Sequence, residues 1–167
     1  AVVNSFGPVV MAAFAVAVKI DTIAYMPVQD LGNAFSVFVA QNYGAERRDR
    51  IRSGIRRTLA SNALFCAVIS VLVCAFAEPL MSLFVDASSA ETIAVGVQYL
   101  RTEGACYIGI GILFMLYGYY RAVNKPMMSV VLTVISLGTR VLLANVLSPI
   151  PEIGVFGIWI AIPIGWL

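Results

Sequence analysis

The sequence predicts an all-α membrane protein, a polytopic bundle of transmembrane helices. Of its 167 residues, 60% are hydrophobic and only 12% are charged, whereas soluble domains average roughly 45–50% apolar and about 25% charged residues. The mean hydropathy is +0.91. A soluble core of this length could not bury so much apolar surface, so the lipid bilayer is the expected partner of the chain.

Apolar runs separated by breakers predict about five helices within one transmembrane lobe over residues 1–167. A bilayer core of about 30 Å requires roughly 20 apolar residues per helix. The approximate spans are residues 9–42, 59–77, 92–121, 127–147 and 154–167. The last span ends within an apolar run, and the chain has no initiator methionine or signal-peptide pattern. We therefore expect a fragment of a longer protein.

The first segment starts at a breaker, Pro8, and continues to Asn42 with only Pro27 interrupting its apolar pattern. At helical rise it is about 50 Å long, more than a bilayer core. It is expected to tilt, to bend at the internal proline or to project from the membrane. Lys19 and Asp21 are expected near the outer interface, where they reach water or line a cleft that opens outward.

Basic residues orient these segments across the membrane. A dense basic run, residues 46–57, follows the first segment, and Arg121 and Lys125 join the third to the fourth. The other two connections, near residues 80–91 and 148–152, contain no Lys or Arg. Because cytoplasmic connections carry the excess of Lys and Arg, both basic connections are placed in the cytoplasm. The expected location is a plasma membrane, here a bacterial inner membrane, crossed several times.

The basic run itself has two interpretations. It serves as a determinant of topology, which we favour, or it also contacts anionic lipid.

In the third segment, Gly104, Gly111 and Gly118 are spaced by seven and share a helical face. Small residues at such spacing let a neighbouring helix approach closely, so their predicted role is structural.

Three charged residues fall in the middle half of the bilayer when depth is counted from the cytoplasmic ends at 1.5 Å per residue. They are Asp30, Glu103 and Arg140. Each costs at least about 2.5–3.5 kcal/mol if it faces lipid, so we expect them to face the protein interior or an aqueous cavity. Pairing of Arg140 with either acid is the expected arrangement. The pattern leaves open whether the group binds a cation or proton, or only bridges the bundle.

Polar residues accompany these charges. Tyr99, Glu103 and Tyr107 are spaced i, i+4, i+8 and form a polar stripe, and Asn33 shares the helical face of Asp30. These are candidates for lining a substrate path.

Neither an enzyme nor a metal site is indicated. The chain has no His, and its three cysteines, Cys66, Cys74 and Cys106, lack metal-ligand spacing. No nucleophile–base pair is apparent either. We expect no enzymatic activity, no cofactor, no metal site and no nucleic-acid partner.

Several phrases, in their order and spacing, resemble the carboxy-terminal lobe of MATE (multidrug and toxic compound extrusion) transporters, and together they extend along essentially the whole chain. They are NSFG (4–7), AAF (12–14), KID (19–21), MP (26–27), LGNA (31–34), FVAQNYGA (38–45), YGYYR (117–121), NKP (124–126), SLGTR (136–140) and GIW (157–159).

The resemblance implies two six-helix lobes that face each other across a central cleft. This chain would span the eighth to the twelfth helix, and its partners would include the missing amino-terminal lobe. Such proteins export small organic, often cationic compounds against a sodium or proton gradient by alternating access.

In the same resemblance, Tyr99 and Glu103 have the spacing of a tyrosine one turn before a cation-binding acid. Glu103 and Asp30, the other acid placed in the middle of the bilayer, are the coupling candidates, with sodium or a proton as the ion. The substrate path would include Asn33, Tyr99 and Tyr107, and Arg140 would keep the acids ionised.

Two alternatives belong to other classes. A flippase for lipid-linked oligosaccharides requires a basic cavity that holds phosphates, and the mixed charge of Asp30, Glu103 and Arg140 argues against it. A membrane scaffold without transport predicts no response to a sodium or proton gradient.

Overall fold

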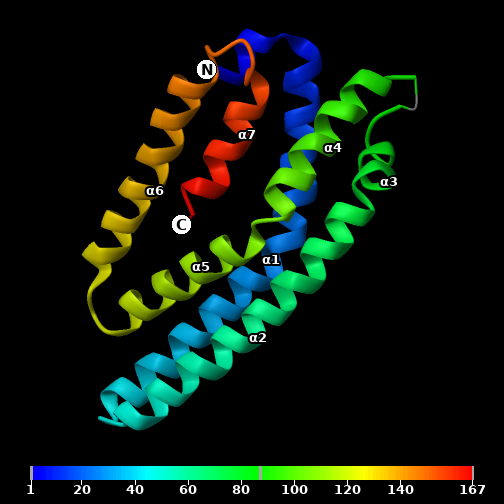
Figure 1. The fold of residues 1–167 in the computed structure, drawn as a ribbon. Coiled ribbons are helices and arrows are strands. Elements are labelled where there is room, and N and C mark those ends of the chain that lie inside the picture. The colour runs from blue at the N-terminus through cyan, green and yellow to red at the C-terminus, as the bar shows by residue number, and fades with distance from the viewer. Residues whose placement is uncertain (1, 87, 167) are drawn as a thin grey trace.

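The structure, a computed structural model, describes residues 2–86 and 88–166, apart from the side chain of Val2. Within those residues all regular structure is helical, and no strand occurs. A 3-10 helix, η1 (Val2–Phe6), precedes helices α1 (Pro8–Gly44), α2 (Arg48–Ala75), α3 (Ala77–Ser82), α4 (Ala90–Gly104), α5 (Tyr107–Ala122), α6 (Pro126–Leu147) and α7 (Val155–Ile164). Figure 1 shows α1 and α2 as long neighbours, with α4 and α5 packed against them and α6 and α7 next to α4 and α5.

Helix α1 runs through the middle of the bundle and contacts α2, α4 and α5. Gly7 precedes it with a φ of 93°, a conformation that favours glycine, and Pro8 occupies its first turn. Pro27 lies inside α1 without ending it. The helix has 37 residues, which makes it about 55 Å long, so its length exceeds a bilayer core as expected.

The basic run after α1 is mostly helical. After a three-residue turn in which Glu46 has a φ of 56°, helix α2 begins at Arg48. Five of the six arginines of this run therefore lie on the first turns of α2, and Arg47 lies in the connection that precedes it. Helix α2 ends at Ala75, and the short helix α3 follows directly.

The helix expected over residues 92–121 is divided in the structure. Helix α4 ends at Gly104, and α5 begins at Tyr107. Two side chains of α2 bind carbonyl groups near the end of α4, where backbone acceptors lose their helical partners. The Ser70 hydroxyl donates to the Gly104 carbonyl, and the Cys74 thiol lies 3.7 Å from the Arg101 carbonyl oxygen. The prediction of one continuous helix was wrong: the polar residues Arg101 to Glu103 and then Gly104 precede the break, and these tertiary contacts support it.

The expected close approach at the spaced glycines is confirmed. A Cβ on Gly118 would lie 2.5 Å from the Gly32 carbonyl oxygen, so α5 and α1 meet there backbone to backbone. A Cβ on Gly111 would lie 2.5 Å from the Asn62 amide nitrogen of α2. The side of Gly104 faces Val73 of α2. Such contacts gain dispersion energy, which drives packing in lipid, where apolar burial contributes little.

Among the described residues, three helices are long and apolar enough to cross a membrane: Pro8–Gly44, Arg48–Ala75 and Pro126–Leu147. The shorter α7 is also apolar. Large apolar side chains along α6 remain exposed, among them Val134, Val141 and Leu142. Contact of such an apolar surface with lipid is favourable, whereas its contact with water is not. The chain is part of a multi-pass membrane protein.

Candidate functional site

The centre of the candidate site is Asp21, which the sequence placed near the outer interface. The structure buries it, with only 4% of its surface exposed, and the Tyr107 hydroxyl of α5 donates a hydrogen bond to its Oδ1 at 2.5 Å. Asp21 extends the buried stripe of α1 that includes Ala13 and Ala17, two turns and one turn before it. That i, i+4, i+8 spacing is the signal in the sequence that would have indicated an interior position for Asp21.

Glu103 is fully buried in the last turn of α4, as expected for an intramembrane acid. It interacts electrostatically with both Asp21 and Arg140. Within the described part of the chain, neither of its carboxyl oxygens has a hydrogen-bond partner. A buried charged group without partners is costly, so this position favours binding of a proton or a cation.

Aromatic side chains enclose the acids. Tyr99, one turn before Glu103, is 3% exposed. Its ring meets Trp159 of α7 edge-on, with the ring centres 5.0 Å apart. Phe14 of α1 stacks on Trp159 at 5.4 Å. The stripe of Tyr99, Glu103 and Tyr107 therefore stays together across the break between α4 and α5, facing α1 and α7.

Arg140 enters from α6 and makes contacts other than those expected. Its Nη2 donates to the Ser136 hydroxyl at 3.2 Å, and its guanidinium lies 5.6 Å from the ring centre of Trp166. The predicted hydrogen-bonded bridge to Glu103 or Asp30 is not formed among the described residues. Arg140 and Glu103 still interact electrostatically, without a hydrogen bond between them.

Asp30 does not join the buried group. It is exposed on α1, nine residues after Asp21, which at 100° per residue turns it to roughly the opposite side of the helix. Lys19, in phase with Asp30, is exposed as well. Among the described residues Asp30 therefore does not pair with Arg140, because it lies on the side of α1 opposite to Asp21, which lines a cavity together with Arg140.

Two adjoining cavities run beside these residues. The first has a volume of about 380 Å³, and its walls include Asp21, Tyr99 and Arg140. The second, of about 330 Å³, shares Phe114, Tyr117 and Thr133 with the first. We refer to both together as the polar cavity. It reaches from Asp21 along α5 toward the end of that helix.

Asn33 lines the second part of the polar cavity as an exposed residue of α1. Its side-chain oxygen accepts a hydrogen bond from Arg121 of α5 at 3.0 Å. Of the residues expected along a substrate path, Tyr99 and Asn33 line this cavity, whereas Tyr107 is buried behind it on Asp21.

The atoms of the site that could bind a ligand are mainly oxygens, from two carboxylates and the tyrosine hydroxyls. Among the described residues, no three His, Cys, Asp or Glu side chains form a group able to hold a metal ion. Two acids with neutral hydroxyls suit a proton or a monovalent hard cation.

Tyr107→Phe is expected to lower the free energy of unfolding by about 1–3 kcal/mol, because the buried Asp21 loses its hydrogen-bond donor. The thermal midpoint of the complete protein in detergent would measure this. Tyr43→Phe makes the same chemical change at an exposed position and serves as control. Equal midpoints for both variants would contradict a contribution of this bond to stability.

Comparison with known proteins supports a family assignment. A sequence profile of the MatE family matches residues 1–146. The chain is 28% identical over 162 residues to "Probable multidrug resistance protein YoeA" of Bacillus subtilis, covering 96% of this chain and 35% of that protein. It is 31% identical over 135 residues to "Probable multidrug resistance protein YpnP" of the same organism, covering 81% and 30%.

A "FAD transporter" of Shewanella oneidensis is 26% identical over 155 residues, covering 92% of this chain and 33% of that protein. The fold matches the structure titled "Crystal structure of MATE in complex with MaD3S" with a TM-score of 0.88 at 17% identity, covering 99% of this chain and 37% of that one. The chain thus spans about a third of the length of its relatives. The profile match over most of the chain shows that it belongs to the MatE family of multidrug and toxic compound extrusion transporters.

Proposed function

We propose that the complete protein is a secondary active exporter of small organic compounds and that this lobe binds its coupling ion, sodium or a proton, at Asp21 and Glu103. The observation that carries the proposal is the pair of buried, interacting carboxyl groups beside a break between two helices. Relatives named as multidrug resistance proteins support export. Ionisable residues inside a membrane generally mark ion pathways.

The break between α4 and α5 also favours the binding of a cation. Glu103 lies in the last turn of α4, where the helix dipole is negative and carbonyl oxygens lack helical partners. Transporters commonly bind coupling cations at such interrupted helices. A cation or proton there reduces the repulsion between Glu103 and Asp21, which the Tyr107 hydroxyl already moderates.

Ion binding would be coupled to substrate binding because Asp21 and Tyr99 belong both to the ion site and to the wall of the polar cavity. Asp21 and Tyr99 face the polar cavity, so their charge and hydrogen bonding depend on whether the ion is bound. An organic substrate in this cavity would contact the same groups, together with Arg140 on the opposite wall. Ion and substrate would thus compete or alternate as the lobe moves against the rest of the protein between inward- and outward-open states.

Transport by everted membrane vesicles that contain the complete protein tests this function. An imposed sodium or proton gradient is expected to drive uptake of a fluorescent organic cation, and the gradient that does so identifies the coupling ion. Vesicles without the protein control for leakage. A neutral or anionic fluorescent substrate widens the search, since one relative is named for FAD. Uptake that responds to neither gradient with any substrate would contradict the proposal.

A further inference from the structure

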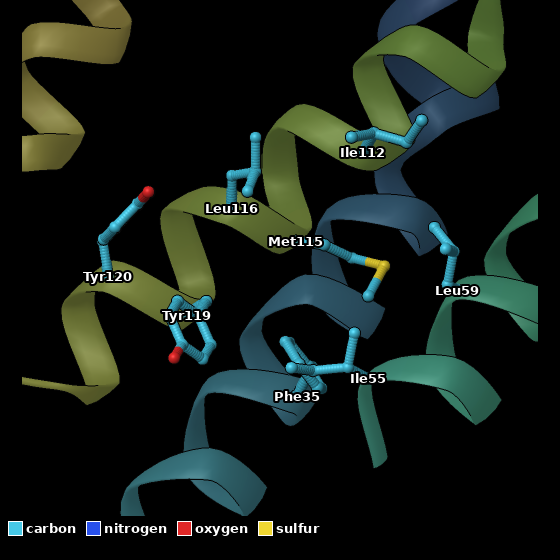
Figure 2. A pocket seen from close by; sticks show the side chains of 8 residues that line it. All are labelled: Phe35, Ile55, Leu59, Ile112, Met115, Leu116, Tyr119 and Tyr120. Atoms are coloured by element: carbon cyan, nitrogen blue, oxygen red, sulfur yellow. The ribbon is translucent and has the colours of Figure 1, made fainter. Parts of the chain in front are cut away.

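An apolar groove of about 290 Å³ lies on the side of α5 that faces away from the polar cavity. Its walls include Phe35 of α1, Ile55 and Leu59 of α2, and Ile112, Leu116 and Tyr119 of α5. Figure 2 shows these side chains around the opening between the three helices. We call it the α2–α5 groove.

The α2–α5 groove is open at its apolar walls. Leu59 is 42% exposed, Ile112 38% and Leu116 37%. In the membrane these side chains meet hydrocarbon, so an acyl chain matches their chemistry. The base of the groove is well packed, because Phe35 is buried with Val39, Ile51 and Met115 in a compact cluster.

One end of the groove is strongly basic. Along α2, Arg48 and Arg52 precede Ile55 and Leu59 at i, i+4, i+7 and i+11, a spacing that keeps all four on one face of the helix. Both arginines are exposed. Tyr119 reaches the same end from the last turns of α5, as expected of an aromatic residue at a membrane interface. The groove thus has apolar walls followed by a cationic end. This order matches the acyl chain and the phosphate of a phospholipid.

We propose that an anionic phospholipid of the cytoplasmic leaflet binds the α2–α5 groove, with an acyl chain against Leu59, Ile112 and Leu116 and its phosphate at Arg48 and Arg52. The positive-inside pattern places this end of α2 at the cytoplasmic surface, where anionic lipids attract basic segments. Binding here is independent of the ion and substrate site, because it uses the other face of α5.

The same helix supplies a matched control. Arg50 and Arg57 lie on roughly the opposite side of α2, at the edge of a separate cavity that Ser53 and Thr58 also line. The double variants Arg48→Gln/Arg52→Gln and Arg50→Gln/Arg57→Gln remove equal charge from the same stretch. Only the first removes it from the end of the α2–α5 groove.

Native mass spectrometry of the complete protein, titrated with palmitoyl-oleoyl phosphatidylglycerol or its phosphatidylcholine analogue, tests the proposal. Wild type is expected to bind the first phosphatidylglycerol about ten- to thirtyfold more tightly than phosphatidylcholine, given about 1 kcal/mol per basic residue near the surface. Arg48→Gln/Arg52→Gln should abolish this preference, and Arg50→Gln/Arg57→Gln should keep it. If the first double variant fails to fold, Arg52→Gln alone should reduce the preference about fivefold.

A second variant separates the chain from the headgroup. Leu116→Trp fills the groove and should weaken binding of both lipids, whereas Leu142→Trp, at an exposed position of α6, should not. Equal loss of preference in both arginine double variants would overturn the proposal in favour of a diffuse surface charge. Wild-type lipid affinity in Leu116→Trp would overturn it as well, since another occupant, such as a helix from the rest of the protein, would then fill the groove.

Discussion

Glu103→Gln and Asp21→Asn are each expected to lower gradient-driven transport by the complete protein about ten- to hundredfold. Each amide keeps the shape of the side chain but loses the charge. A hydrogen bond or ligand contact to a charged group is worth about 1.5–3 kcal/mol, which corresponds to that range in ion affinity. Initial rates of fluorescent-substrate uptake in everted vesicles, normalised to the amount of folded protein, measure the effect.

Two further carboxyl-to-amide variants make this test specific. Glu91→Gln changes an exposed acid in the first turn of α4 and should transport as wild type does. Asp30→Asn changes the exposed acid of α1 that the sequence also nominated. If Asp30→Asn abolishes transport while the Asp21 and Glu103 variants remain active, the coupling site lies on the surface of this lobe and our assignment is wrong.

Gly118→Ala is expected to destabilise the protein by about 1–3 kcal/mol, the usual cost of overfilling a packed interior. The added methyl group would lie 2.5 Å from the Gly32 carbonyl oxygen. Backbone atoms cannot move aside as a flexible side chain does, so α5 and α1 must separate. The thermal midpoint of the purified complete protein in detergent should fall.

Gly138→Ala provides the control for this variant. Gly138 also lies inside a helix, α6, and a Cβ there would meet no atom within 4 Å. Its substitution should be neutral or should stabilise by up to about 1 kcal/mol through helix propensity. Equal shifts in midpoint for the two variants would show that the contact between α5 and α1 is not tight.

Much of the fold follows from local pattern. The apolar runs and their breakers predicted helices at the positions of α1, α2, α6 and α7, because a chain in lipid must satisfy its backbone within each segment. The spaced glycines predicted close helix contacts, and Gly118 makes one with the backbone of α1. Both signals act over a few turns of a single helix, so sequence alone reveals them.

The division between α4 and α5 was not predicted from the sequence. The polar residues Arg101, Thr102 and Glu103 and then Gly104 stand directly before the break, but the Ser70 and Cys74 groups that support it come from α2, some thirty residues earlier in the chain. Likewise, Asp21 looked like an interfacial residue when judged by depth alone. Its place on the buried stripe of α1 could be read from helical spacing, but its hydrogen-bond partner Tyr107, 86 residues away, could not.

The sequence by itself determined that this is a helical membrane protein, where breakers separate most of its helices, which connections are basic, and that Glu103 lies in the interior, since composition and period depend only on residue type and spacing. The tertiary structure decided which acids meet. Glu103 and Asp21 come together with Tyr99 and Tyr107, while Asp30 turns outward. The physical reason is that a site requires helices to pack in a particular rotation, and that rotation depends on contacts between residues far apart in the chain.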